Sequence, residues 1–389
     1  MSLSARLSDN TTPKRILSLD GGGIRGAITI GYLEKVEELL KARFSHINDF
    51  RLCDYFDLIG GTSTGSIIAG CLALGMTMSQ VKEKYLTLGN LIFHEKNKLW
   101  DLWQIKKALQ ARYNDANFNS MLESTFRDDQ NQDILLGSPL IRSGLCIIAK
   151  RADTNSTWTL NNHPEDPFYQ SLEGQNALIP LKQAIRASSA APTYFIPEVI
   201  EVGTNQTAAF VDGGVSSVNN PSFALLMVAT MKGYAFRWNT GEFNLFMLSI
   251  GTGSNAFKTT VHSVEENWML SWAMQVPEML MADASILNQI IMQWISRGKT
   301  KKHINLQIGN MEQDMLTKEP LLTYNRYNTD MSEDYLKSLG FHLGNGYKSI
   351  ADLMEMSNGN NANLLYQIGR AAAEAEVTEE HFPPQFDLK

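Results

Sequence analysis

The sequence predicts an α/β fold in which helices cover both faces of a mostly parallel central sheet, with a helical addition at the C-terminal end. Within residues 15–74, strand, glycine-rich turn and helix follow one another twice, which is the order of a parallel sheet. The 389-residue length favours one large α/β domain. We expect a flexible N-terminus over 1–14, a core over 15–255 and a mainly helical part over 256–389 that packs on the core.

The first strand, turn and helix carry a glycine cluster. An apolar run at 15–19 predicts a buried strand, and Asp-Gly-Gly-Gly-Ile-Arg-Gly at 20–26 follows it directly. From Ala27 to about Phe44, apolar residues recur at helical spacing. Bare backbone N–H groups at such a helix start can point into a cavity and stabilise a negative oxygen. The cluster is therefore a candidate oxyanion hole.

The second strand, turn and helix place a serine between glycines. An apolar run at 55–59 leads into Gly61-Thr62-Ser63-Thr64-Gly65, and a helix over about 66–74 is predicted after it. In a G-x-S-x-G turn the serine lies on a sharp bend, and the glycines stand where a Cβ would collide with the neighbouring strand and helix. The pattern predicts that the hydroxyl of Ser63 is presented as a nucleophile.

Further elements continue the α/β pattern. Residues 78–125 are predicted to form a helical excursion, in which Trp100 and Trp103 lie on an amphipathic segment over 99–109. That segment could pack on the core or form a lid that faces lipid. Strands and one short helix follow, at 144–149, 157–160, 180–187 (the helix), 208–211 and 243–250.

The composition excludes several classes of protein. A formal net charge of −7 argues against a nucleic-acid binder or a polybasic membrane anchor. Three cysteines in apolar contexts argue against a disulfide framework and fit a reducing cytoplasm. The first residues lack an apolar signal core, and no stretch has the roughly 18 apolar residues that a spanning helix needs. We therefore expect a cytoplasmic protein.

A serine hydroxyl needs a partner that accepts its proton. Ser63, Asp212 and His262 would give the serine, aspartate, histidine order of the α/β-hydrolases. Asp212, however, ends its own strand at the Gly213-Gly214 turn, as though the carboxylate itself were presented. A desolvated carboxylate can act as a general base. Asp212 acting alone is the first choice, and the triad with His262 stays open.

Five motifs in this order resemble the patatin-like phospholipase family. They are Asp-Gly-Gly-Gly-Ile-Arg-Gly at 20–26, Gly-Thr-Ser-Thr-Gly at 61–65, Ala-Ser-Ser-Ala-Ala-Pro-Thr-Tyr-Phe at 187–195, Asp-Gly-Gly at 212–214 with Asn219-Asn220-Pro221, and Leu-Ser-Ile-Gly-Thr-Gly at 248–253. The resemblance implies a three-layer α/β/α fold and a Ser/Asp dyad, with Ser63 as nucleophile and Asp212 as base. It also implies an oxyanion hole and motif turns at Gly21, Gly22, Gly23, Arg25 and Gly26, and at Gly61, Gly65, Gly213 and Gly214.

The resemblance further implies a lipid acyl hydrolase that needs no metal or organic cofactor and meets phospholipid at the inner membrane as a peripheral protein, with a homo-oligomer as an open possibility. An acyltransferase with the same acyl-enzyme, or a lipid-binding or storage protein, is the alternative. Some bacterial members resemble antiphage effectors that cyclic dinucleotides activate. The basic run at 297–303 could hold such a phosphate, and the methionine-rich helix predicted over 268–295 could line an acyl-chain channel, cover the active site or simply pack.

Overall fold

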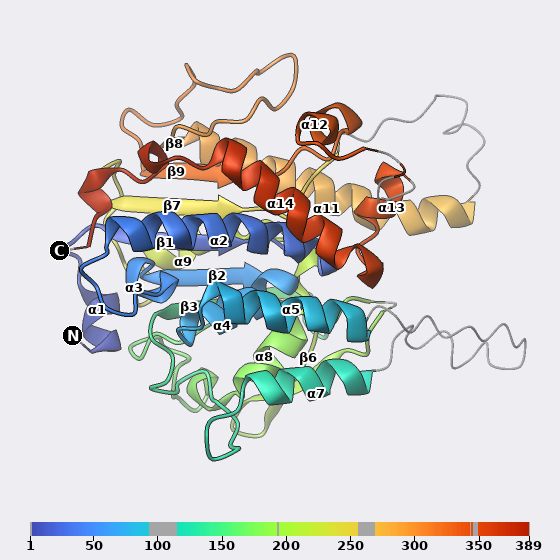
Figure 1. The fold of residues 1–389 in the computed structure, drawn as a ribbon. Coiled ribbons are helices and arrows are strands. Elements are labelled where there is room, and N and C mark those ends of the chain that lie inside the picture. The colour runs from blue at the N-terminus through green and yellow to red at the C-terminus, as the bar shows by residue number, and fades with distance from the viewer. Residues whose placement is uncertain are drawn as a thin grey trace, which may run out of the picture.

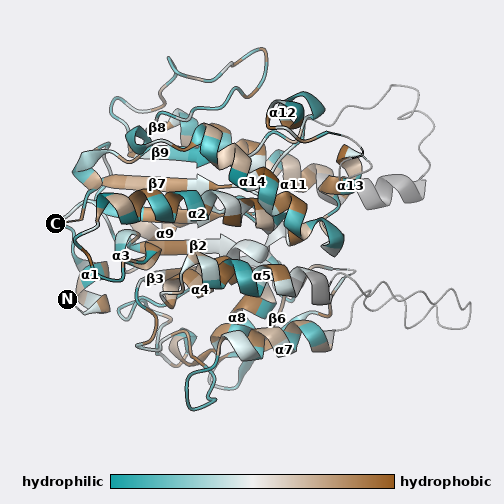
Figure 2. Ribbon diagram, viewed as in Figure 1, coloured by the Kyte–Doolittle hydropathy of each residue, from teal (hydrophilic) through white to brown (hydrophobic). Residues whose placement is uncertain are grey.

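The central strands are apolar on both sides, as a sheet with two covered faces requires. The computed structural model describes residues 2–92, 115–192, 194–255, 269–342, 344 and 349–388. In it, alternate residues of each central strand belong to two separate cores. On β1 (Lys14–Leu19), Leu17 packs on one side of the sheet and Ile16 on the other. β2 (Leu58–Thr62) divides in the same way, and the apolar character of β2 and β7 is visible in Figure 2.

The described strands form one nine-stranded sheet with the path β5-β6-β3-β2-β1-β7-β9-β8, and β4 pairs with β3. Neighbours from β3 through β2, β1, β7 and β9 to β8 are parallel, whereas β4, β5 and β6 pair antiparallel. This confirms the predicted mostly parallel sheet. The other strands are β3 (Gly144–Arg151), β4 (Ser156–Asn161), β5 (Glu198–Gly203), β6 (Gln206–Asp212), β7 (Leu245–Ile250), β8 (Ser296–Arg297) and β9 (Leu322–Tyr327).

Helices cover both faces of the sheet (Figure 1). One face carries α2 (Gly26–Arg43), α3 (Leu52–Tyr55), α4 (Thr64–Ala73), α5 (Met78–Ile92), α7 (Asp115–Thr125), α8 (Leu181–Ser188) and α14 (Ala362–Glu376). The other face carries α9 (Ser222–Thr230) and α11 (Met269–Trp294). Two short helices, α12 (Glu333–Ser338) and α13 (Ile350–Met354), lie between α11 and α14 in the chain. The result is the expected three-layer α/β/α arrangement.

The N-terminus differs from the flexible segment that was expected over 1–14. Residues Leu3–Ser8 form the helix α1, and Leu7 is buried. The guanidinium of Arg6 donates to Asp57 at 2.8 Å and to the carbonyls of Cys53 and Asp54. A polar sequence therefore folds here because its arginine supplies the hydrogen bonds that the end of α3 needs.

The C-terminal part is not only helical. β9 pairs parallel with β7, so the sheet continues across the boundary that was expected at residue 255. Polar residues of β9 are buried, including Thr323, Asn325 and Arg326, so this strand has no apolar run to predict it. The helix predicted over 268–295 is present as α11. The segment 99–109 lies outside the described residues.

Among the described helices, none combines the length and hydropathy needed to cross a membrane.

Candidate active site

The serine turn lies at the carboxyl end of β2, where the chain bends sharply into α4. Ser63 has φ 53° and ψ −124°, a left-handed backbone conformation that L-residues rarely adopt. A Cβ on Gly65 would lie 2.7 Å from the carbonyl carbon of Leu19, so only glycine lets α4 approach β1 this closely. Ser63 itself stays partly exposed. The bend therefore presents its hydroxyl as the G-x-S-x-G pattern predicts.

Ser63 and Asp212 meet directly. The hydroxyl of Ser63 donates to Oδ2 of Asp212 at 2.6 Å, and the amide of Gly214 donates to Oδ1 at 2.7 Å. Asp212 is only 5% exposed. Burial raises the pKa of Asp212 to about 6, against the lowering effect of the hydrogen bonds from Ser63 and Gly214. The carboxylate is thus a stronger base than an aspartate in water, and it already accepts a hydrogen bond from the hydroxyl whose proton it would take.

The short segment 188–190 forms hydrogen bonds to the backbone of both Ser63 and Asp212. The hydroxyl of Ser188 accepts from the amide of Ser63 at 2.9 Å and donates to the carbonyl of Ile148 at 2.6 Å. Two residues later, the carbonyl of Ala190 accepts from the amide of Asp212 at 3.0 Å. The run of small residues at 187–191 indicated close packing, but nothing in it showed that Ser188 would support the nucleophile.

The alternative triad has no room for its histidine between these two side chains. Because Ser63 Oγ and Asp212 Oδ2 are 2.6 Å apart, no imidazole fits between them. His262 lies outside the described residues.

The glycine loop borders the serine. A Cβ on Gly21 would lie 3.2 Å from the Cβ of Ser63. The amide of Gly21 already donates to the carbonyl of Asn219 at 3.0 Å, and the amide of Gly26 bonds back to the loop. Within the described ranges, no acceptor lies within hydrogen-bonding distance of the amides of Gly22 and Gly23. The structure thus differs from the expectation at Gly21 and leaves Gly22 and Gly23 as the available donors.

Side chains from distant segments fix this loop. The hydroxyl of Tyr85 on α5 donates to the carbonyl of Gly23, and that of Thr252 after β7 donates to the carbonyl of Gly21 at 3.1 Å. The Nε of Arg25 lies 3.5 Å from the carbonyl of Gly22. A Cβ on Gly22 would lie 2.6 Å from the Cβ of Thr252, so no larger residue fits there. Arg25 thus lies against the loop, and its role in shaping the loop stays a prediction.

A buried ion pair lies directly behind the glycine loop. Arg326 on β9 donates to both carboxylate oxygens of Asp20, at 3.1 and 2.6 Å, and to the hydroxyl of Ser249 at 2.6 Å. Both charged side chains are almost fully buried. Burial raises the pKa of Asp20, although Arg326 favours its charged form. No local pattern predicts this pair, because its members are 306 positions apart in the sequence.

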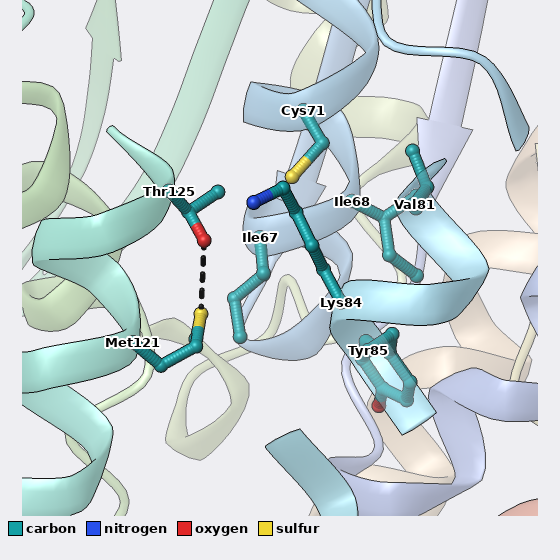
Figure 3. A pocket seen from close by; sticks show the side chains of 8 residues that line it. All are labelled: Ile67, Ile68, Cys71, Val81, Lys84, Tyr85, Met121 and Thr125. Atoms are coloured by element: carbon teal, nitrogen blue, oxygen red, sulfur yellow. Dashed lines mark hydrogen bonds between the residues drawn. The ribbon is translucent and has the colours of Figure 1, made fainter. Parts of the chain in front are cut away.

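A small apolar pocket lies between α4, α5 and α7, and the dyad residues do not line it. Figure 3 shows its lining side chains, among which Met121 and Thr125 contact each other at 3.4 Å. Ile67 and Cys71 contribute the wall from α4. Since Ser63 and Asp212 are absent from the lining, the pocket is separate from the site that these two residues form.

The basic run at 297–303 is largely engaged with the protein itself. Lys299 pairs with Glu380 at 3.0 Å, and Lys302 pairs with Glu376 at 3.4 Å. Lys301 donates to the carbonyl of Met311 at 2.9 Å. These lysines connect the run to the end of α14, to the segment after α14 and to its own loop, so the structure does not favour an open phosphate site there.

The chain is similar in sequence to known proteins. A family model described as patatin-like phospholipase matches residues 17–225. The chain is 30% identical over 244 residues to a cGAMP-activated phospholipase of Escherichia coli, covering 61% of this chain and 62% of that protein. It is also 30% identical to a cGAMP-activated phospholipase of Vibrio cholerae, over 54% and 56% of the two chains. Patatin-07 of Solanum tuberosum is 25% identical over 74% of this chain and 72% of its own. The chain thus spans less than two thirds of the length of either bacterial relative.

Proposed function

Because the chain belongs to the patatin-like phospholipase family, we propose that it hydrolyses carboxylic esters of membrane phospholipids through Ser63 and Asp212. The observation that carries this proposal is the 2.6 Å hydrogen bond from the Ser63 hydroxyl to a buried carboxylate. The amides of Gly22 and Gly23 support it, because they follow Gly21, which borders Ser63, and acyl transfer needs donors for a tetrahedral oxyanion.

In the first half of the reaction, Ser63 Oγ attacks the ester carbonyl while its proton passes to Oδ2 of Asp212. The carbonyl oxygen becomes negative and is stabilised by the amides of Gly22 and Gly23, a contribution of roughly 3–4 kcal/mol for one such donor. Collapse of the intermediate breaks the ester bond. Asp212 then gives the proton to the departing alkoxide, which leaves as a lysolipid.

The second half repeats these steps with water. Asp212 accepts a proton from a water molecule as its oxygen attacks the acyl-enzyme, and the same amides stabilise the new oxyanion. The bond from the acyl carbon to Ser63 Oγ then breaks, and the proton returns to Ser63 as the fatty acid leaves. A buried carboxylate with a pKa of about 6 is ionised at neutral pH and can still hold the proton during each step.

We also propose that a cyclic dinucleotide activates the enzyme in antiphage defence, where it would act from the cytoplasm on the inner membrane. Support comes from the two bacterial relatives, which are both described as cGAMP-activated phospholipases. The activator site is not assigned to residues 297–303, because lysines of that run pair within the chain. Adding cGAMP should raise fatty-acid release severalfold, and equal rates with and without it would remove this part of the proposal.

The test is release of fatty acid from mixed phospholipid vesicles, with chelator present and with and without cGAMP. Ser63→Ala should abolish release, because it removes the nucleophile. Ser216→Ala is the matched control: its hydroxyl donates to the carbonyl of Gly213 and does not contact Asp212. Equal release by the wild type and Ser63→Ala would refute the dyad. Transfer of the acyl group to added glycerol instead of water would identify an acyltransferase.

A further inference from the structure

The long helix α11 carries apolar residues on its solvent side. Val276, Leu280, Leu287 and Trp294 recur at spacings of four and seven residues, which places them on one stripe of a helix. All are exposed, Leu280 to 63% and Leu287 to 55%. Met279 and Ile286 are exposed on the same side, and we call these six residues the outer stripe. At 1.5 Å per residue the stripe is roughly 27 Å long.

The inner side of α11 combines apolar contacts with polar ones. Met292 is buried in the core on this face of the sheet. Asn288 is buried and donates from Nδ2 to the carbonyl of Ser217 at 2.6 Å. Gln293 is 1% exposed and bonds to the carbonyls of Lys302 and Asn310. These contacts hold α11 on the protein, and the outer stripe is apolar surface left over after the helix has packed.

The inner face of α11 contacts the loop that follows the catalytic aspartate. Met281 lies 3.4 Å from the position of a Cβ on Gly214, and Ser285 lies within 3.5 Å of Asn219. Figure 1 shows the N-terminal half of α11 reaching past the carboxyl ends of the parallel strands. Ser63 directly follows β2 at this end of the sheet, and Asp212 pairs with Ala149 near the end of β3. The outer stripe is therefore displayed at the end of the molecule where substrate must enter.

The helix that carries the outer stripe has few charges. Between residues 276 and 294 the sequence has no cation and only two acids, Glu278 and Asp283. Trp294, a residue suited to the boundary of a bilayer, ends the stripe. No described helix qualifies as a membrane span, so a helix of this kind would lie in the interface.

We propose that the outer stripe of α11 docks the enzyme on a phospholipid surface and thereby brings Ser63 to its substrate. This inference rests on the proposed function, because a phospholipid substrate is what makes a lipid surface the partner at this end of the molecule. A second copy of the chain is the competing occupant. It would bury the stripe equally well, but it would bring no substrate to the active site.

The test is co-flotation of the protein with vesicles of phosphatidylethanolamine and phosphatidylglycerol. Ser63→Ala serves as the background, so that hydrolysis cannot alter the vesicles. Adding Leu280→Glu with Leu287→Glu should weaken vesicle binding about tenfold or more, because two apolar side chains become charged. Phe243→Glu is the matched control. Phe243 is 64% exposed and lies before β7, at the opposite end of the sheet.

A second variant should have the opposite effect on vesicle binding. Asp283 is exposed and lies within the arc of the stripe, seven residues after Val276 and four before Leu287, so Asp283→Asn should strengthen binding to these anionic vesicles about twofold or more. In the catalytically intact background, the Leu280→Glu, Leu287→Glu pair should cleave a soluble short-chain ester within about twofold of the wild-type rate, since exposed substitutions perturb a fold little.

Several outcomes would overturn the inference. They are no vesicle binding by the wild type, binding that the leucine pair leaves unchanged, and an equal loss in Phe243→Glu. A dimer that the leucine pair converts to a monomer during sedimentation, with vesicle binding unchanged, would assign the stripe to a second copy. If binding depends on the stripe but no ester is cleaved under any condition, the docking surface stands and the proposed function falls.

Discussion

Replacing Asp212 by asparagine should abolish hydrolysis and stabilise the fold. The amide keeps the shape of the carboxylate, its oxygen can still accept from Gly214, and its nitrogen can donate to Ser63. What disappears is a buried negative charge that, among the described residues, accepts hydrogen bonds from that hydroxyl and that amide. The carboxylate is needed as a base, so the same change that removes catalysis removes an energetic cost of the folded state.

The size of this cost follows from the pKa. Burial raises the pKa of Asp212 from 3.8 to about 6, a difference of about two pKa units. Each unit corresponds to about 1.36 kcal/mol, so ionised Asp212 lowers the free energy of unfolding by roughly 3 kcal/mol at neutral pH. With an unfolding entropy of about 2.1 cal/mol/K per residue over 389 residues, Asp212→Asn should raise Tm by roughly 4 °C.

The pH dependence of the stability gain shows whether the buried charge of Asp212 is its cause. A group whose folded pKa is raised favours the folded state below its unfolded pKa and loses that contribution as pH rises through the folded value. The increase in the free energy of unfolding caused by Asp212→Asn should therefore be complete near pH 8 and fall to about a third of that value near pH 4.5.

Calorimetry or urea denaturation of the two proteins at both pH values measures this difference. Ser63→Ala is the inactive control, because it keeps the charge and should show no gain. An unchanged Tm in Asp212→Asn at pH 8, or a gain equal at both pH values, would refute the argument.

Three further predictions concern the residues around the pair. Below pH 6, kcat/KM for a soluble ester should fall about tenfold per pH unit as Asp212 is protonated, and a flat profile down to pH 5 would exclude it as the base. Gly22→Ala should lower kcat about a hundredfold, because its Cβ would overlap Thr252 and displace the oxyanion donors; an unaltered kcat would remove Gly22 from that role. Arg326→Gln should lower both stability, by about 3–5 kcal/mol, and kcat, by at least about tenfold. Arg15→Gln breaks a comparable buried pair at the other end of β1 and should lower stability alone, so equal kcat losses in both variants would contradict a positioning role for Arg326.

The parts of the fold that the sequence predicts are those with local signals. The strand and helix on either side of Ser63 follow from apolar runs and glycines within a few residues of one another, and the structure places them within a few positions of the prediction. Asp212 was found for the same reason, because its strand and its Gly213-Gly214 turn are contiguous.

What the sequence could not predict depends on contacts between distant segments. β9 is buried but polar, and its residue Arg326 contacts Asp20 because the sheet brings the two distant segments together. Ser188 supports the nucleophile by a hydrogen bond that no local pattern indicates. The amide of Gly21 belongs to a motif that suggested an oxyanion donor, yet its carbonyl partner, on Asn219, comes from a loop nearly 200 positions away. Motifs identify the backbone amides that could be oxyanion donors, and tertiary contacts decide which of these amides have no other acceptor.

The position of β1 in the sheet links catalytic competence to the completion of translation. A ribosome releases β1 and β2 early, but β7, the other neighbour of β1, comes much later, and β9 with Arg326 later still. A nascent chain that has emerged as far as Ser63 has no base, and one that has emerged as far as Asp212 lacks the arginine behind the glycine loop. If Ser63 and Asp212 act as proposed, unfinished or prematurely terminated chains lack a complete site.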